Sequence, residues 1–119
     1  MTEVPTEISN FFLAMQAGSA AAGTMHDLFD TDAIYEEPFS GTPRVHEGRT
    51  AILDVMSAGW AQPLPDMHLR IDRAETSGST IVIDWTCSSP ALPGGAGSGR
   101  NVFELRDGRI VRLKTTLAM

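Results

Sequence analysis

The chain has 119 residues and a formal net charge of −6, with 42% hydrophobic and 20% charged residues; this is an ordinary globular balance, and its acidic excess argues against nucleic acid or an anionic membrane as partner. No apolar run reaches the length of a membrane span, no secretory signal segment opens the chain, and the single cysteine, Cys87, excludes an internal disulfide. We therefore expect one domain over residues 1–119, located in the cytoplasm.

Three segments in the first half of the chain have the apolar spacing of helices. In residues 6–18 the apolar residues repeat at i, i+3, i+4 and i+7, with Thr6 as candidate N-cap and Gly18 as a natural stop. A shorter helix follows with Ser19 as its cap, and a third covers residues 47–61. The apolar faces of the three helices are formed by Ile8, Phe11, Phe12 and Met15, by Ala22, Met25, Leu28 and Phe29, and by Ile52, Val55, Met56 and Trp60.

The other elements are predicted as strands. Residues 30–32 read as a turn, and residues 33–37, "AIYEE", as a strand closed by Pro38. From residue 67 onward apolar and polar residues alternate, which predicts antiparallel strands over residues 67–74, 80–88, 100–106 and 109–117. Asp107-Gly108 indicates a type I′ hairpin between the last two strands, and "SSPALPGGAGSG" reads as a flexible connection. This order predicts an α+β fold in which helices lie across a curled sheet and leave an apolar pocket between.

The segments "LFDTDAIYEEPF…HEGRTAI" and "FELRDGRIVRLKTTL", in this order of elements, carry a resemblance to a known family. From about Ile8 to Leu117 the chain resembles the nuclear transport factor 2-like superfamily, in particular its SnoaL-like and ketosteroid-isomerase-like members. The resemblance implies a cone-shaped curved antiparallel sheet wrapped by N-terminal helices, a deep apolar cavity, no cofactor, and a homodimer formed through the outer sheet face. Because this fold hosts isomerases, cyclases, dehydratases, epoxide hydrolases and binding proteins, it does not fix the chemistry.

Glu37 is the candidate catalytic base. The resemblance selects the acid immediately before the proline that ends the first strand, and alternation along the strand places Tyr35 and Glu37 on one face and Ile34 and Glu36 on the other. A carboxylate in an apolar cleft has a raised pKa, which suits it to take a proton from carbon beside a carbonyl. The alternative is that both glutamates are solvated at the end of the strand.

The donors that such a reaction needs depart from the isomerase pattern. Phe11 stands where the resemblance implies a tyrosine donor, and Asn101 where it implies a protonated aspartate. Phenylalanine donates nothing, and the Asn101 amide is a weaker, neutral donor, so Tyr35 is a candidate to supply the missing hydroxyl. For Asn101 the alternative is a satisfied polar residue in a strand.

Other chemistries have less support in the sequence. The three histidines are scattered without the spacing of metal ligands, so no metal site is expected. His68 lies on the polar face of its strand, and His26 and His46 fall in helix and loop contexts, so no dehydratase-type His/Asp pair is expected either. Arg70 and Asp72 read as an outward-facing ion pair, and Cys87 as a buried thiol.

The expected pocket lining suits a small hydrophobic molecule with one carbonyl or hydroxyl. It consists of Phe11, Met15, Tyr35, Met56, Trp60, Trp85, Asn101, Phe103 and Leu113. Two hypotheses follow. The first is a cofactor-independent enzyme, like a ketosteroid isomerase or polyketide cyclase, with Glu37 as general base. The alternative is a non-catalytic module of the same fold that binds a small hydrophobic ligand or forms a dimeric interaction.

Overall fold

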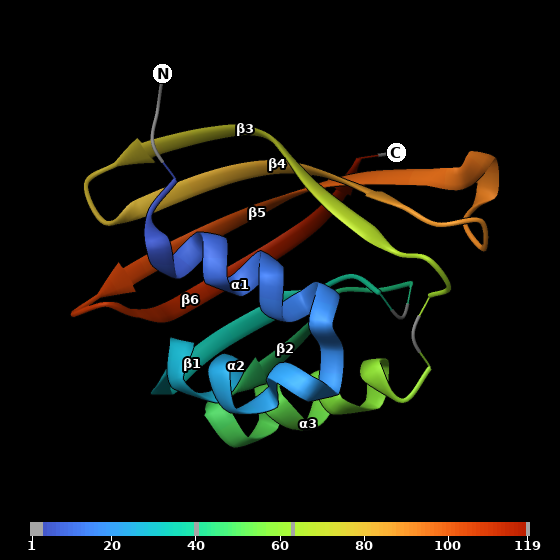
Figure 1. Ribbon diagram of the computed structural model, residues 1–119. Helices are drawn as coiled ribbons and strands as arrows, with labels where there is room; N and C mark the ends of the chain where they lie inside the picture. The colour runs from blue at the N-terminus through green and yellow to red at the C-terminus, as the bar shows by residue number, and fades with distance from the viewer. Residues whose placement is uncertain (1–3, 40, 63, 119) are drawn as a thin grey trace.

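The computed structural model describes residues 4–39, 41–62 and 64–118. Its helices lie together on the concave side of a curved sheet (Figure 1). They are α1 (Thr6–Ala17), the 3₁₀ turn η1 (Gly18–Ala21), α2 (Ala22–Leu28) and α3 (Arg49–Trp60). None of the helices in the described ranges is long and apolar enough to cross a membrane.

The ends of the first two helices differ in part from the sequence prediction. Gly18 does end α1, with a φ of 69°, but Thr6 is its first residue and makes no cap; instead the carbonyl of Pro5 accepts the first bonds of the helix. Ser19 caps nothing, because η1 separates the two helices. Phe29, predicted on the apolar face of the second helix, begins the first strand.

Six strands form one sheet in the order β2-β1-β6-β5-β4-β3. They are β1 (Phe29–Glu37), β2 (Arg44–Glu47), β3 (His68–Ser77), β4 (Thr80–Ser88), β5 (Ala96–Arg106) and β6 (Arg109–Ala118). Strands β3 to β6 are antiparallel neighbours as predicted, β1 pairs parallel to β6, and β2 pairs antiparallel to β1. The α+β fold is therefore confirmed, with a sheet that curves without closing (Figure 1).

Three strand predictions need correction. Residues 30–32 lie inside β1 rather than in a turn, and the register with β6 slips in this stretch. Strand β2 was not predicted, because its four residues are mostly exposed and show no alternation of apolar and polar residues. The glycine-rich connection is shorter than expected, because η2 (Pro93–Gly95) leads directly into β5. The type I′ turn is consistent with positive φ at both Asp107 and Gly108.

An aromatic cluster fills the space between α1 and the sheet. The ring of Phe11 lies edge-on to Phe103 at a centroid distance of 5.1 Å and contacts Phe12 and Phe29 in the same manner. On β4, Ile81, Ile83, Trp85 and Cys87 all face this core, as the alternation predicts. The tight packing of these rings decides how much room is left for a ligand.

Candidate functional site

Glu37 is the last residue of β1 and is fully buried, with 1% of its surface exposed. Tyr35 and Ala33 are buried on the same face of the strand, whereas Ile34 and Glu36 are only partly buried on the other. The alternative in which both glutamates are solvated is therefore wrong. Burial of an ionisable side chain requires partners, and the neighbouring strand supplies them.

Arg44 and His46 of β2 hold the Glu37 carboxylate. The Nε and Nη2 atoms of Arg44 lie 2.9 and 2.8 Å from Glu37 Oε2, and His46 Nε2 lies 2.8 Å from the same oxygen. The backbone N–H of Phe39 donates to Oε1 at 2.8 Å. The antiparallel register, which pairs Glu37 with Arg44 and Tyr35 with His46, brings these groups together.

These donors reverse the expected electrostatics of the site. Burial by itself raises the pKa of Glu37, but the hydrogen bonds from His46 and Phe39 and the charge of Arg44 outweigh it, so the pKa falls below its ordinary value of 4.5. The expectation of a raised pKa is therefore wrong. Glu37 is ionised at neutral pH, and hydrogen-bond donors surround its buried carboxylate where apolar side chains were expected.

Asn101 on β5 is fixed by two donors. Its Oδ1 accepts hydrogen bonds from Trp85 Nε1 at 3.0 Å and from Thr115 Oγ1 at 2.8 Å. An indole N–H can only donate, so the oxygen of Asn101 must face it and the amide nitrogen must point away. No described residue accepts from that nitrogen, and no unpaired side-chain nitrogen or oxygen in the described ranges is fully buried. The Asn101 amide nitrogen is thus a donor without a described acceptor and is not completely sealed, although the residue is only 4% exposed.

Glu37, Thr115 and Asn101 belong to one row across the sheet. Thr115 pairs directly with Asn101, and Tyr35 pairs with Leu113, so Glu37 follows next to Thr115 on the same face. Two strand spacings separate Glu37 from Asn101, which is about 10 Å. Tyr35 is hydrogen-bonded with Thr115, and burial raises its pKa well above the ordinary value, so it stays a neutral phenol. The row therefore combines one anionic acceptor with neutral donors.

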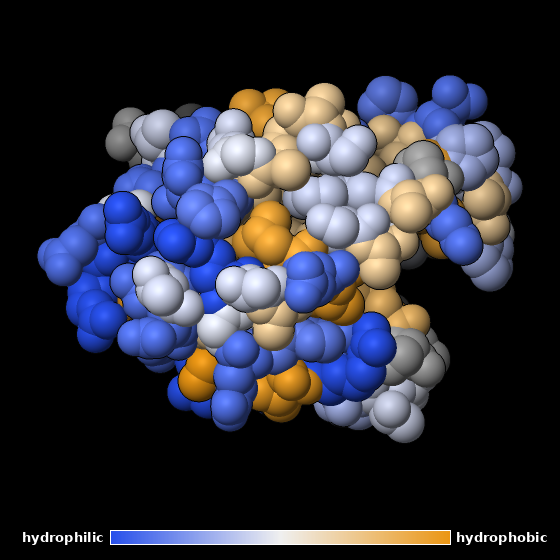
Figure 2. Space-filling model, turned by 90° about the horizontal axis from the view of Figure 1, so that it is seen from below, coloured by the Kyte–Doolittle hydropathy of each residue, from blue (hydrophilic) through white to orange (hydrophobic). Residues whose placement is uncertain are grey.

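Most of the predicted lining residues form the packed core. Tyr35, Met56, Trp85, Asn101, Phe103, Leu113 and Phe11 are buried, whereas Met15 and Trp60 are partly buried and pack against the core. Phe11 lies within the aromatic cluster, where no hydroxyl is available. Seen from below, the outline is indented on the right, the side on which β1 ends in Figure 1, and apolar residues flank the indentation (Figure 2).

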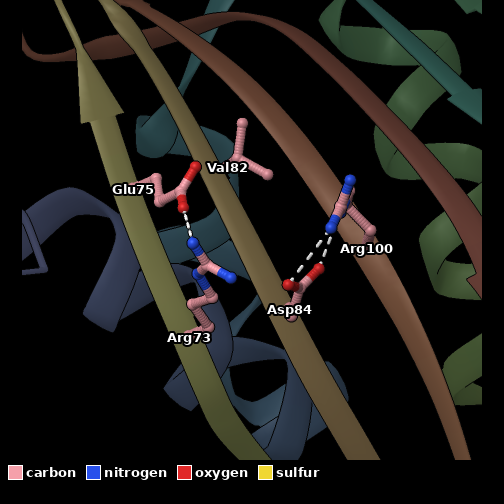
Figure 3. A pocket seen from close by; sticks show the side chains of 5 residues that line it. All are labelled: Arg73, Glu75, Val82, Asp84 and Arg100. Carbon is pink, nitrogen blue, oxygen red and sulfur yellow. Dashed lines mark hydrogen bonds and ion pairs between the residues drawn. The ribbon is translucent and has the colours of Figure 1, made fainter.

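Two surface hollows lie on the outer face of the sheet instead of between helices and sheet. One, of about 290 Å³, is lined by Arg73, Glu75, Val82, Asp84 and Arg100 (Figure 3), and the other adjoins it at Asp84 and Arg100. Two ion pairs, Arg73–Glu75 and Asp84–Arg100, line the first hollow.

The remaining sequence expectations can be compared with the structure directly. Arg70 and Asp72 form the predicted outward ion pair at 2.6 Å, and Cys87 is buried. His46 was expected in a loop, and this was wrong, because it lies in β2. A strand pairing between residues 33–37 and 44–47 across the turn at Gly41 was the signal that could have found it. Residues 4–39, 41–62 and 64–118 contain no group of three or more His, Cys, Asp or Glu able to hold a metal ion.

Comparison with known proteins identifies the family. Among solved structures, a proposed polyketide cyclase from Sinorhizobium meliloti is similar, with a TM-score of 0.77, 22% identity and 95% of each chain covered. A proposed isomerase from Bacillus subtilis has a TM-score of 0.75 and 23% identity, over 94% of this chain and 84% of that one. An LEH-like epoxide hydrolase from M. tuberculosis has a TM-score of 0.73 and 19% identity, over 94% and 80%.

These identities are low enough that the structures show the shared fold and not a shared reaction. A search of the curated proteins found no match. The model of the SnoaL-like domain family matches residues 8–113, which is most of the chain. This chain therefore belongs to the SnoaL-like domain family.

Proposed function

We propose that this protein is a small cofactor-independent enzyme that moves a proton on carbon next to a carbonyl, with Glu37 in the role of general base. One observation carries the proposal: a buried, ionised carboxylate shares a row of the sheet with the Asn101 amide nitrogen, a donor without a described acceptor. The names of the similar polyketide cyclase and isomerase agree with this chemistry.

The proton and the charge balance within one substrate. The base removes a proton from the carbon beside the carbonyl, and the carbonyl oxygen becomes an enolate oxygen. The amide N–H of Asn101 donates a hydrogen bond to that oxygen, which is where a preorganised donor lowers the barrier most. The O–H of Tyr35 is donated to Thr115, whose own proton goes to Asn101, so Tyr35 supports this donor indirectly. The proton then returns to another carbon of the same molecule, so no cofactor or oxidant is consumed.

The substrate class follows from the surroundings of the row. A small hydrophobic molecule suits the buried apolar side chains beside the row, among them Phe103 and Leu113. The ligand has to displace part of the packing around Met15 and Trp60, the two lining residues that are only partly buried.

The experiment compares two adjacent glutamates. Glu37→Gln removes the buried carboxylate, whereas Glu36→Gln changes a partly exposed residue that only pairs with Lys114 at 3.5 Å. In a panel of β,γ-unsaturated and polycyclic ketones, the wild type and Glu36→Gln should isomerise substrate. Glu37→Gln should lose at least about 100-fold in kcat. Equal rates in wild type and Glu37→Gln would contradict Glu37 as the base.

A second candidate function is a binding module for small hydrophobic ligands. It is favoured by Phe11, which offers no hydroxyl, and by the lowered pKa of Glu37, which weakens the carboxylate as a base. Titration of polycyclic ketones monitored by tryptophan fluorescence distinguishes the two functions. Micromolar binding without turnover of any ketone supports the binding module.

We also propose that two copies pair through the outer face of the sheet. Two exposed ion pairs, Arg73–Glu75 and Asp84–Arg100, lie near each other there, so this face offers both positive and negative side chains to a second copy of itself (Figure 3). Analytical ultracentrifugation should show a dimer, and Val82→Glu in the middle of this face should yield a monomer. A monomeric wild type contradicts the proposal.

A further inference from the structure

We propose that the residue which exchanges the proton with the substrate is His46, through its Nδ1, while Glu37 positions the imidazole. The inference rests on the proposed function and changes one role in it: Glu37 is still required, but it acts through His46 instead of taking the proton itself. It starts from the position of His46 on β2, where the side chain is 16% exposed and its ring lies 6.0 Å from that of Tyr35.

The contact with Glu37 fixes the state of the neutral ring. An ionised carboxylate can only accept hydrogen bonds, so Nε2 of His46 donates across the 2.8 Å contact and Nδ1 carries the lone pair. No described residue bonds Nδ1, and no unpaired side-chain nitrogen in the described ranges is fully buried, so this atom is accessible. His46 therefore presents an open acceptor beside the buried carboxylate.

The imidazole is better placed than the carboxylate to take the proton. Protonation of Glu37 would weaken the interactions with Arg44, His46 and the Phe39 N–H at once. Proton transfer to His46 instead leaves the contacts of the carboxylate with Arg44, His46 and the Phe39 N–H in place. Tyr35 and Arg44 are the other ionisable groups next to the pair, and Tyr35 stays neutral.

The step balances without another reactant. The C–H bond beside the carbonyl breaks, its electron pair becomes the enolate, and the proton joins Nδ1 of His46. The imidazolium then returns the proton to another carbon of the same substrate. Glu37 remains ionised throughout, so its low proton affinity is an advantage for this arrangement.

Kinetics of matched variants test the proposal. His46→Gln keeps an N–H that can donate to Glu37 but cannot carry the proton, and His68→Gln on β3 is the exposed control. We expect His46→Gln to lower kcat by about 100-fold or more with a smaller change in KM, and His68→Gln to match the wild type. The double variant with Glu37→Gln should be no slower than the worse single variant, and added imidazole should restore rate to His46→Ala.

The outcomes separate the role inferred for His46 from the proposed enzymatic function. If Glu37→Gln is inactive while His46→Gln keeps the wild-type kcat, Glu37 acts on the substrate directly and this inference fails although the proposed function stands. If the wild type turns over no ketone, both fail. Nitrogen-15 NMR of labelled histidine gives a readout without substrate: the neutral ring of His46 should carry its proton on Nε2. A proton on Nδ1 overturns the inference.

Discussion

The indole of Trp85 donates a 3.0 Å hydrogen bond to the side-chain oxygen of Asn101, from β4 to β5. This bond decides which end of the Asn101 amide is free, so it connects a core residue to the chemistry proposed for the site. Trp85→Phe keeps most of the ring but removes the donor. We expect a loss of about 1 kcal/mol in the free energy of unfolding and a fall in kcat larger than any change in KM. Urea unfolding and steady-state kinetics measure both, and an unchanged kcat would argue against Asn101 as a donor to the substrate.

Gly99 leaves the space that the Trp85 ring occupies. A Cβ at residue 99 would lie 2.3 Å from Trp85 Cζ2 and 2.7 Å from the carbonyl oxygen of Thr116, whereas a Cβ at Gly97 would meet nothing within 4 Å. Gly99→Ala should therefore lower the free energy of unfolding by about 1–3 kcal/mol, and Gly97→Ala should change it much less. Equal urea midpoints for the two variants would show that the ring does not pack on this backbone.

The interactions of Glu37 with Arg44 and His46 make the free energy of unfolding depend on pH in the acid range. Because the pKa of Glu37 is lower in the folded than in the unfolded chain, its contribution is fully present above the unfolded value of about 4.5 and is lost as pH falls through the folded value. In Glu37→Gln the free energy of unfolding should fall less steeply as the pH is lowered, and in Glu36→Gln it should fall as in the wild type. Thermal unfolding between pH 3 and pH 7 tests this, and parallel curves for wild type and Glu37→Gln would contradict the lowered pKa.

Cys87 should be unreactive in the folded protein. Its side chain faces the core on β4, and burial raises the pKa of its thiol, so little thiolate forms and reagents cannot reach it. A thiol reagent such as dithionitrobenzoate should modify it only after denaturation. Rapid modification of the native protein would mean that this part of β4 opens to solvent.

How much the sequence could predict depends on whether the signal was local. Alternation over residues 33–37 and 80–88 placed Tyr35, Glu37 and Trp85 on the inner face correctly, because a strand's period of two is written in its own residues. The prediction of a turn at residues 30–32 was wrong. Its acidic residues favour a turn locally, but pairing with β6 at Phe29 and again from Ile34 onward keeps the stretch between them inside β1.

The electrostatics of the site depended on pairing that no local pattern encodes. Strand β2 has four mostly exposed residues, and it forms because it can pair with β1. Arg44 and His46 were therefore missed as partners, and with them the direction of the pKa shift of Glu37. Likewise, the packing of Phe11 on Phe103 joins residues far apart in the chain, so this contact could not be predicted from either segment alone.

The central claim is that the buried carboxylate of Glu37 is required to move a proton on carbon. Exchange of the hydrogens beside a ketone carbonyl for deuterium, followed by NMR in heavy water, measures this step without assuming a product. Wild type and Glu36→Gln should catalyse the exchange, while Glu37→Gln should exchange no faster than buffer. Exchange by Glu37→Gln at the wild-type rate would contradict the account.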